Sequence, residues 1–322
     1  MYPRPELSEL SALPAVLHPP LSVARSLAEA RACGVTEAHL AGVDCLLLNA
    51  GPSVGPHALS ELLSACPSLQ WVHTSLAGVN NSLPALLNTD VVLTNAKGVF
   101  SHSLAEWTLF ACSFFAKSLP RLLAAQHRAD WAPYEVETLR GKTMGIIGFG
   151  DIGRTTGTLA RAYGMKVVAL RRTAATPDDV VAQFYPAHQL NDLLAVCDYV
   201  VLCTPLTAET QSMIGASAFA AMKPTAVFIN IGRGPCVDEG ALIEALRCGR
   251  IRGAALDVFQ VEPLLKESPL WALPNVLLSP HNADRTCESH AESVRAFVAN
   301  AERYVQGGVA ALTSVVDKRA GY

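Results

Sequence analysis

The chain has 322 residues, of which 50% are apolar and 16% are charged, and its formal net charge is −3. This length predicts about two globular domains with sizeable cores. The weak acidity and the lack of a basic block argue against a nucleic-acid-binding protein, and apolar runs such as Trp107–Ala116 are too short to span a membrane.

The cysteines and the first residues bear on the compartment. The nine cysteines are scattered without a CxxC pair, which is typical of reduced thiols, and no metal site is predicted. The sequence begins with acids and prolines and has no apolar core there, so no secretory signal is predicted. We expect a cytoplasmic protein, with import into an organelle through a cleaved peptide as the alternative.

The first hundred residues alternate short apolar runs with helical patterns, which predicts a parallel sheet covered on both faces. The turn Ser75–Val79 follows directly on a strand, where open sheets bind ligands, so its backbone N–H groups are candidates for holding an anion. Taken alone, the turn is better explained as an ordinary connection. The expected strands are Ala15–His18, Cys45–Asn49, Trp71–Thr74 and Val91–Thr94, and the expected helices include Leu21–Cys33 and His57–Cys66.

A long apolar helix follows this first unit. Ser103 and Glu106 have the spacing of a capping box, which predicts a helix over Leu104–Leu119. Pro120 is expected to end or kink this helix, and a second helical piece runs to about Ala129. We interpret these helices as the crossover into a second domain.

The second domain reads as a doubly wound parallel sheet. A strand is predicted over Thr143–Ile147, and each later strand follows a helical segment. The later strands are expected at Lys166–Leu170, Tyr199–Cys203, Ala226–Ile229, Gly253–Asp257 and Val276–Ser279. A helical pattern over Glu288–Val305 then returns the chain to the first domain. The predicted domains are therefore residues 1–102 plus 288–322, and residues 103–287.

The strand Thr143–Ile147 leads into a glycine-rich turn and a helical pattern, in the order of the dinucleotide-binding fingerprint. Gly148 allows the tight turn, Gly150 lets the backbone approach a pyrophosphate, and Gly153 lets helix and strand pack closely. The start of the helix offers N–H groups and a positive dipole end to the phosphates. The predicted cofactor-binding residues here are Gly148, Phe149, Gly150, Asp151, Ile152 and Gly153.

Three ionisable residues follow the late strands of this domain. Arg233, Glu262 and His281 each come after a different strand, at the edge that faces a cofactor crevice. Singly they are explained as a surface arginine, a loop carboxylate and a hydrogen-bonded histidine. Together, downstream of the fingerprint, they predict a catalytic cation, acid and base.

These segments resemble the D-isomer-specific 2-hydroxyacid dehydrogenases over nearly the whole chain. GKTMGIIGFGDIGR resembles the cofactor motif of that family, and NIGRGPCVDEGAL, ALDVFQVEP and SPH resemble its arginine, glutamate and histidine motifs. The resemblance implies a flavodoxin-like substrate domain hinged to a Rossmann domain, in a homodimer joined through the Rossmann domains. It also implies that Ala77 and Gly78 hold the substrate carboxylate. The further cofactor contacts that it implies are Thr204, Pro205, Ile231 and Asp257.

The chemistry of the three groups suits reduction of a 2-keto acid. Arg233 can fork onto the carboxylate and the carbonyl. His281 can protonate the developing alkoxide, and Glu262 beside it would raise the histidine pKa and fix its tautomer. The segment Asn282–Arg285 and Gly232 depart from the usual family pattern, which bears on the substrate and not on the reaction type.

The end of the second strand of this domain predicts the cofactor. NAD-binding proteins carry an acid there for the ribose hydroxyls, whereas this chain has Arg171, Arg172 and Thr173. These residues suit a 2′-phosphate, so we predict NADPH, with NADH as second choice. The alternative is two solvated arginines.

We therefore predict an NADPH-dependent reductase of a small 2-keto acid, with glyoxylate or hydroxypyruvate favoured. The alternatives are NAD-dependent oxidation of D-3-phosphoglycerate or D-lactate, and a dinucleotide-sensing protein like the corepressors that share this fold. Formate dehydrogenases carry a glutamine partner for the histidine, so Glu262 argues against them.

Overall fold

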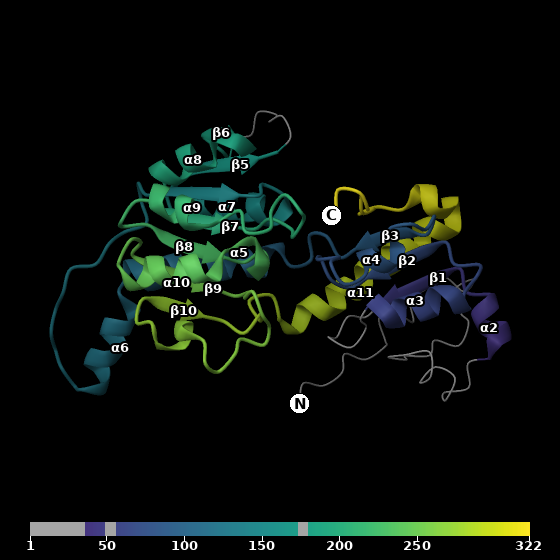
Figure 1. Ribbon diagram of the computed structural model, residues 1–322, viewed down its shortest axis with the longest axis horizontal. Coiled ribbons are helices and arrows are strands. Elements are labelled where there is room, and N and C mark those ends of the chain that lie inside the picture. The colour runs from purple at the N-terminus through teal and green to yellow at the C-terminus, as the bar shows by residue number, and fades with distance from the viewer. Residues whose placement is uncertain (1–35, 49–55, 173–179) are drawn as a thin grey trace. The chain divides into compact units, whose positions relative to one another are not determined.

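The computed structural model describes residues 36–48, 56–172 and 180–322. The chain divides into two compact units: the smaller ends at Phe100 and resumes at Arg285, and the larger is Ser101–Asp284. Both units have parallel sheets with helices (Figure 1), so the predicted α/β class is confirmed. The strand expected at Ala15–His18 and the helix expected at Leu21–Cys33 lie outside the described residues.

The described strands of the smaller unit form a parallel sheet in the order β1-β2-β3. These strands are β1 (Cys45–Leu48), β2 (Trp71–Thr74) and β3 (Val92–Asn95). Because β2 lies in the middle and both of its faces are covered, all four of its residues are buried, including the polar His73 and Thr74.

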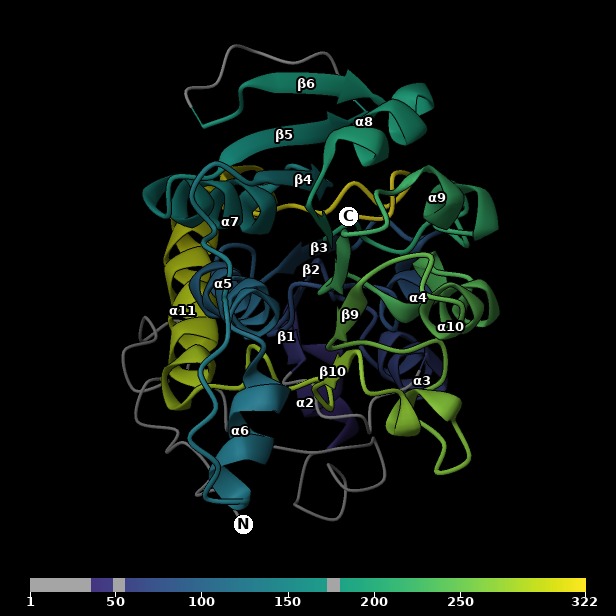
Figure 2. The same ribbon diagram turned by 90° about the vertical axis from the view of Figure 1, so that its left-hand side faces the viewer.

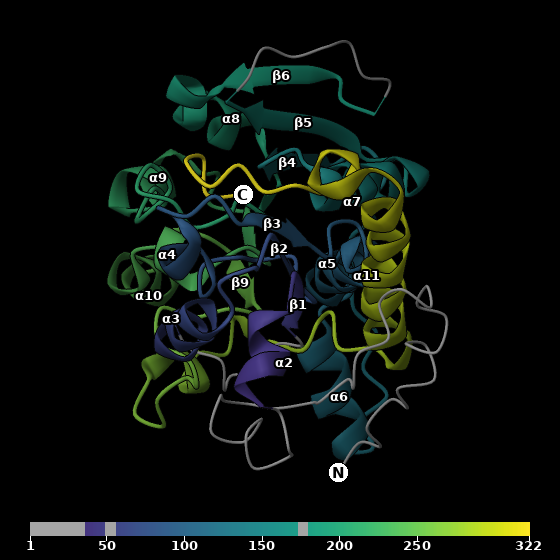
Figure 3. The ribbon, with the colours of Figure 1, turned by 90° about the vertical axis from the view of Figure 1, so that its right-hand side faces the viewer.

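Successive residues of β2 point to opposite faces, and each face meets different helices. Val72 packs in one cluster with Leu59 of α3 (Pro56–Ala65) and Leu86 of α4 (Leu83–Leu86). Trp71 stacks on Phe297 of α11 (Cys287–Gly307), with 5.3 Å between ring centroids. Figure 3 shows α11 on one side of this sheet and α3 and α4 on the other. The short helix α2 (Glu37–Ala41) precedes β1.

The larger unit is a Rossmann fold, whose described strands form a seven-stranded parallel sheet in the order β10-β9-β8-β7-β4-β5-β6. The direction of strand order reverses between β4 and β7, so the loops after these two strands meet at the switch point where such sheets bind ligands. The strands are β4 (Thr143–Ile147), β5 (Lys166–Arg171), β6 (Gln183–Pro186), β7 (Tyr199–Leu202), β8 (Val227–Asn230), β9 (Gly253–Leu256) and β10 (Val276–Leu278).

Helices cover both faces of this sheet (Figure 2). One side carries α5 and α7, and the other carries α8, α9 and α10, whose apolar residues join the strands in one core cluster. The helices are α5 (Ser101–Ala116), α6 (Leu119–His127), α7 (Asp151–Ala162), α8 (Leu190–Val196), α9 (Ala216–Ala221) and α10 (Glu239–Arg247). No helix in the described ranges is long and apolar enough to cross a membrane.

The helix is interrupted near Pro120 and a second helical piece follows, as expected, but the start of α5 and the exact place of the break differ from the prediction. Helix α5 begins at Ser101, so Ser103 lies inside its first turn, where the Ser103 hydroxyl donates to the carbonyl of Ala283 and not to a helix N–H. Helix α5 ends at Ala116, and Pro120 lies in the first turn of α6, where a missing N–H costs nothing. Strand β6 was not predicted.

Candidate active site

The glycine-rich turn after β4 has the backbone that its sequence suggests. Gly148 has φ +95°, a conformation that residues with a side chain rarely adopt. A Cβ at Gly153 would lie 2.4 Å from the carbonyl oxygen of Gly148, so α7 packs against the strand only because Gly153 has none. A Cβ at Gly150, in contrast, would meet no atom of the described residues within 4 Å.

This open space lies where a pyrophosphate would approach. Gly150 is the N-cap of the twelve-residue helix α7, whose first turn has N–H groups without intrahelical partners. An anion at a helix start is stabilised by these N–H groups and by the helix dipole. The turn therefore fits the diphosphate of a dinucleotide.

The loop after β7 is held against this turn. The thiol of Cys203 donates to the carbonyl of Gly148 at 2.9 Å. The next residues, Thr204 and Pro205, are partly exposed. A Cβ at Gly232, in the loop after β8, would lie 2.8 Å from the carbonyl oxygen of Thr204, so the two loops are in close backbone contact. The predicted cofactor residue Ile231 is buried beneath them.

Arg233 is positioned by its glycine neighbours. A Cβ at Gly234 would overlap the backbone of Phe259, so the arginine loop lies directly on the loop that leads to Glu262. Asn230 accepts from the N–H of Gly232 at 3.0 Å, and Arg233 Nη1 donates to the carbonyl of Gly232 at 2.7 Å. Burial lowers the pKa of Arg233, and the negative charges of Glu262 and Asp284 oppose that shift.

His281 and Glu262 are in direct contact. His281 Nδ1 lies 2.7 Å from Glu262 Oε2, and Glu262 Oε1 accepts from the N–H of Phe259 at 2.9 Å. This hydrogen bond raises the pKa of His281, against the opposing effect of burial. Burial raises the pKa of Glu262. The hydrogen bonds from His281 and Phe259 and the nearby positive charges lower it by a larger amount, so the net shift is downward. The two side chains are 43% and 34% exposed, which leaves the imidazole accessible.

Asp257 holds the histidine loop in place. It is 1% exposed, and its Oδ1 accepts from Ser279 Oγ at 2.6 Å and from the N–H groups of Asn282 and Ala283 at 3.0 and 3.1 Å. His281 donates its own N–H to the carbonyl of Asp257 at 2.9 Å and has φ +52°. This left-handed backbone is strained for a residue with a side chain, and such strain is typical of functional sites.

Asp284 was not among the predicted site residues, but it lies near them. Its carboxylate interacts electrostatically with His281 and Arg233, and burial raises its pKa. The only sequence signal was its position in the unusual segment after His281. That signal does not say whether the side chain faces Arg233, since Arg233 is far away in the sequence.

The predicted 2′-phosphate residues lie at the end of β5. Arg171 is the last residue of this strand, and Thr173 lies outside the described residues. Arg172 Nη1 donates to Glu209 Oε2 at 3.0 Å, an ion pair that sequence reasoning missed.

In the smaller unit, the turn after β2 exposes part of its backbone. Asn95 Nδ2 donates to the carbonyl of Ala77 at 2.7 Å, and Ala96 donates its N–H to Leu76. Within the described residues, the N–H groups of Ala77 and Gly78 have no acceptor. The turn thus leaves two donors available at the carboxyl end of a strand.

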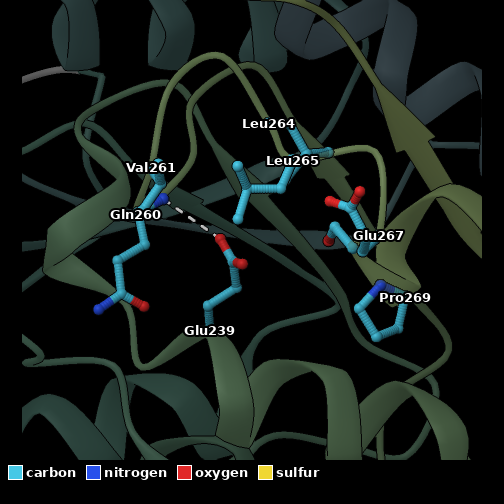
Figure 4. A pocket seen from close by; sticks show the side chains of 8 residues that line it. Glu239, Gln260, Val261, Leu264, Leu265, Glu267 and Pro269 are labelled. Atoms are coloured by element: carbon cyan, nitrogen blue, oxygen red, sulfur yellow. Dashed lines mark hydrogen bonds between the residues drawn. The ribbon is translucent and has the colours of Figure 1, made fainter.

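A pocket of about 300 Å³ lies beside the loop that carries Glu262 (Figure 4). Across it, the N–H of Gln260 donates to Glu239 at 3.2 Å. None of the three predicted catalytic side chains lines the pocket, so the chemistry is assigned to the groups around His281. Across the described parts of the chain, no cluster of histidine, cysteine and acidic residues is arranged to hold a metal ion.

Known proteins resemble both the sequence and the fold. The family model described as D-isomer specific 2-hydroxyacid dehydrogenase, NAD binding domain, matches residues 110–283. A glyoxylate reductase of Thermococcus gammatolerans is 42% identical over 240 residues, 70% of each chain.

Two solved structures align with most of the chain. A D-isomer specific 2-hydroxyacid dehydrogenase of Xanthobacter autotrophicus Py2, in complex with NADPH and MES, has a TM-score of 0.78 and 32% identity, covering 88% of this chain and 86% of the other. An NADPH-dependent glyoxylate/hydroxypyruvate reductase of Sinorhizobium meliloti, in complex with NADP and sulfate, has a TM-score of 0.76 and 30% identity, covering 87% of each.

Proposed function

This chain belongs to the D-isomer-specific 2-hydroxyacid dehydrogenases, a family of NAD(P)-dependent oxidoreductases, and on that premise we propose that it reduces a small 2-keto acid with NADPH. Glyoxylate and hydroxypyruvate are the favoured substrates, and the product is a 2-hydroxy acid, which has the D configuration when C2 is a stereocentre, as with hydroxypyruvate. The observation that carries this proposal is the 2.7 Å contact between His281 and Glu262, which lie in the same unit as Arg233 and the glycine-rich turn after β4.

The residues divide the work as follows. The guanidinium of Arg233 binds the keto acid and polarises its carbonyl, since its planar donors match two oxygens at once. His281, whose charged form is favoured by the contact with Glu262, donates a proton to the oxygen that gains charge. The nicotinamide cofactor, when bound, supplies the hydride. The N–H groups of Ala77 and Gly78 are proposed to hold the substrate carboxylate.

The proposed activity is tested by measuring reduction rates with a panel of keto acids. NADPH and NADH oxidation would be followed with glyoxylate, hydroxypyruvate, pyruvate, phenylpyruvate and 3-phosphohydroxypyruvate. We expect the highest kcat/KM with NADPH and one of the first two acids, and a loss of roughly 10²–10⁴-fold in His281→Asn. Binding of NADPH without turnover of any acid would refute the reductase and favour a dinucleotide-sensing protein.

A homodimer through the larger unit is also proposed. None of the residues of α6 is buried, and Leu122 and Leu123 on it are 44% and 45% exposed. Trp131, in the segment that follows, is 95% exposed. Such apolar exposure is typical of an association surface. Light scattering should give twice the chain mass, and Leu123→Asp with Trp131→Ser should give monomers; a monomeric wild type would refute the dimer.

The described cysteines are free thiols, which supports a reducing compartment such as the cytoplasm.

A further inference from the structure

The ion pair between Arg172 and Glu209 joins the loops that follow two strands, β5 and β7, which are not adjacent in the sheet. Arg172 follows β5 directly, and Glu209 lies in the turn after β7. In the sheet, β4 lies between these two strands. Because all the strands of this sheet are parallel, their carboxyl ends lie along one edge. The pair therefore bridges the end of β4, where the glycine-rich turn begins.

Glu209 is carried by a fixed turn. Thr207 donates its N–H to Thr210 Oγ1 at 2.8 Å, and that hydroxyl donates to the carbonyl of Pro205 at 2.7 Å. Gln211 donates its N–H to the carbonyl of Thr207 at 3.0 Å. The backbone beneath the Glu209 side chain is therefore held by several hydrogen bonds, which presents its carboxylate to Arg172.

Both partners remain accessible to a ligand. The side chains of Arg172 and Glu209 are 46% and 69% exposed, so solvent and ions reach the pair. The end of β5 is where a Rossmann unit meets the adenosine ribose. A 2′-phosphate on that ribose carries more charge than a carboxylate, so it competes with Glu209 for the same guanidinium.

We propose that Glu209 is a specificity-determining residue for the cofactor: its carboxylate is an internal counter-anion of Arg172, and a 2′-phosphate must displace it. This proposal rests on the proposed binding of NADPH. Glu209 thus moderates the preference for NADPH over NADH, because only the phosphorylated cofactor has to break the pair. In this proposal Glu209 supplies a carboxylate near the ribose site, although the end of β5 itself has no acidic residue.

The effect is measured directly as ligand affinity. Adenosine 2′,5′-bisphosphate carries the 2′-phosphate and 5′-AMP lacks it, so calorimetric titration of both with the full chain isolates the contact. In Glu209→Gln, the bisphosphate should bind about two- to fivefold more tightly, the range expected for an exposed ion pair. The affinity for 5′-AMP should not change, and added salt should reduce the difference.

Two further variants separate the pair from a general charge effect. In an Arg172→Ala background, Glu209→Gln should no longer change bisphosphate affinity. Glu244→Gln removes the same charge from an exposed site on α10, which leads to β9 on the far side of the sheet, and it should have no effect.

The outcomes distinguish this proposal from the proposed function. If Glu209→Gln binds the bisphosphate no more tightly than wild type, or if its gain persists without Arg172, the counter-anion role is wrong. If wild type binds bisphosphate and 5′-AMP equally while Glu209→Gln gains affinity for the bisphosphate alone, the counter-anion role stands and the NADPH preference fails.

Discussion

In the proposed reaction His281 donates the proton, so its charge matters, and the contact with Glu262 favours the charged form. The contact with Glu262 raises the pKa of His281, so the protonated form persists to higher pH than in an isolated histidine. Reduction requires this form, so kcat/KM for the keto acid should be constant at low pH and fall as pH rises through the raised pKa.

In Glu262→Gln the same fall should begin at lower pH, because the neighbouring negative charge is gone. The check is the pH profile of kcat/KM for wild type and variant. Glu267→Gln, an exposed carboxylate on the same loop, is the matched control. Superimposable profiles for wild type and Glu262→Gln would show that the pair does not control the proton donor.

The Asp284 carboxylate is expected to influence which substrates are reduced. It interacts with Arg233 and His281, so it opposes a second negative charge on the substrate. In Asp284→Asn, kcat/KM for the dianion oxaloacetate should rise about three- to tenfold relative to glyoxylate, the effect of one nearby charge in a partly exposed site. Asp192→Asn, on the exposed surface of α8, removes an equal charge and should leave the ratio unchanged. An unchanged ratio in Asp284→Asn itself would remove Asp284 from substrate selection.

At the scale of elements, two glycines of one turn should respond in opposite ways to alanine. Gly153→Ala forces a Cβ to 2.4 Å from the Gly148 carbonyl oxygen, so α7 must shift, and overpacking of this kind costs about 1–3 kcal/mol. The Cβ of Gly150→Ala meets no atom within 4 Å in the part of the chain that the structure describes, so this variant should keep the wild-type melting temperature. Its Cβ fills the space proposed for the pyrophosphate, so NADPH affinity should fall at least about tenfold.

Calorimetric melting and NADPH titration of both variants test this contrast. Gly240→Ala, where the nearest contact of the new Cβ is 3.4 Å, is the control and should change neither quantity by much. A melting temperature lowered equally by both substitutions would contradict separate roles for the two glycines.

The elements that could be predicted are those whose signal is local. Strands β4, β7 and β8 are buried on both faces, so they read as apolar runs and their predicted bounds lie within about one residue of those observed. Strand β6 reads QFYP and was missed, because a sheet edge tolerates polar residues and a proline such as Pro186. The start of α5 was misplaced because Ser103 bonds to Ala283, 180 residues away.

The same limit applies to the site. The positions of Arg233, Glu262 and His281 at strand ends could be predicted because each follows a strand within a recognisable motif, whereas their catalytic roles stay a prediction. The contacts of Glu209 and Asp284 could not be predicted, since they depend on neighbours brought together by the sheet order. Gly232 was noted only as a departure, whereas the structure gives its reason: a Cβ there would lie 2.8 Å from the Thr204 carbonyl oxygen.

One buried histidine is expected to make the stability of the smaller unit depend on pH. His73 on β2 is 0% exposed, its Nδ1 lies 2.7 Å from Thr94 Oγ1, and within the described residues its Nε2 has no hydrogen-bond partner. Burial lowers its pKa to about 4, so the folded chain holds it neutral. The unfolded chain protonates it near pH 6.5, so stability should fall as pH drops from there toward 4, by about 3 kcal/mol in total.

Amide hydrogen exchange on β1–β3 at pH 7, 6 and 5 measures this loss within the smaller unit. Wild-type protection should fall below pH 6.5 by up to about tenfold per unit of pH. The decline should be shallower in His73→Phe whatever the absolute stability of the variant. His57→Phe, at a side chain that is 91% exposed, should keep the wild-type slope. Parallel slopes in wild type and His73→Phe would exclude His73 as the cause.

The smaller unit is built from two stretches of chain that are separated in the sequence by the whole larger unit, and this affects its folding during synthesis on the ribosome. Trp71 stacks on Phe297, and Ser75 accepts a hydrogen bond from Ser293, 218 residues later. At roughly 5–20 residues per second, these partners emerge about 10–40 s after the strand that needs them. The unit that ends at Asp284 is complete before then. During that interval β2 lacks the cover of α11 and presents Trp71 to the surrounding solution, so the nascent chain is expected to need a chaperone at this strand.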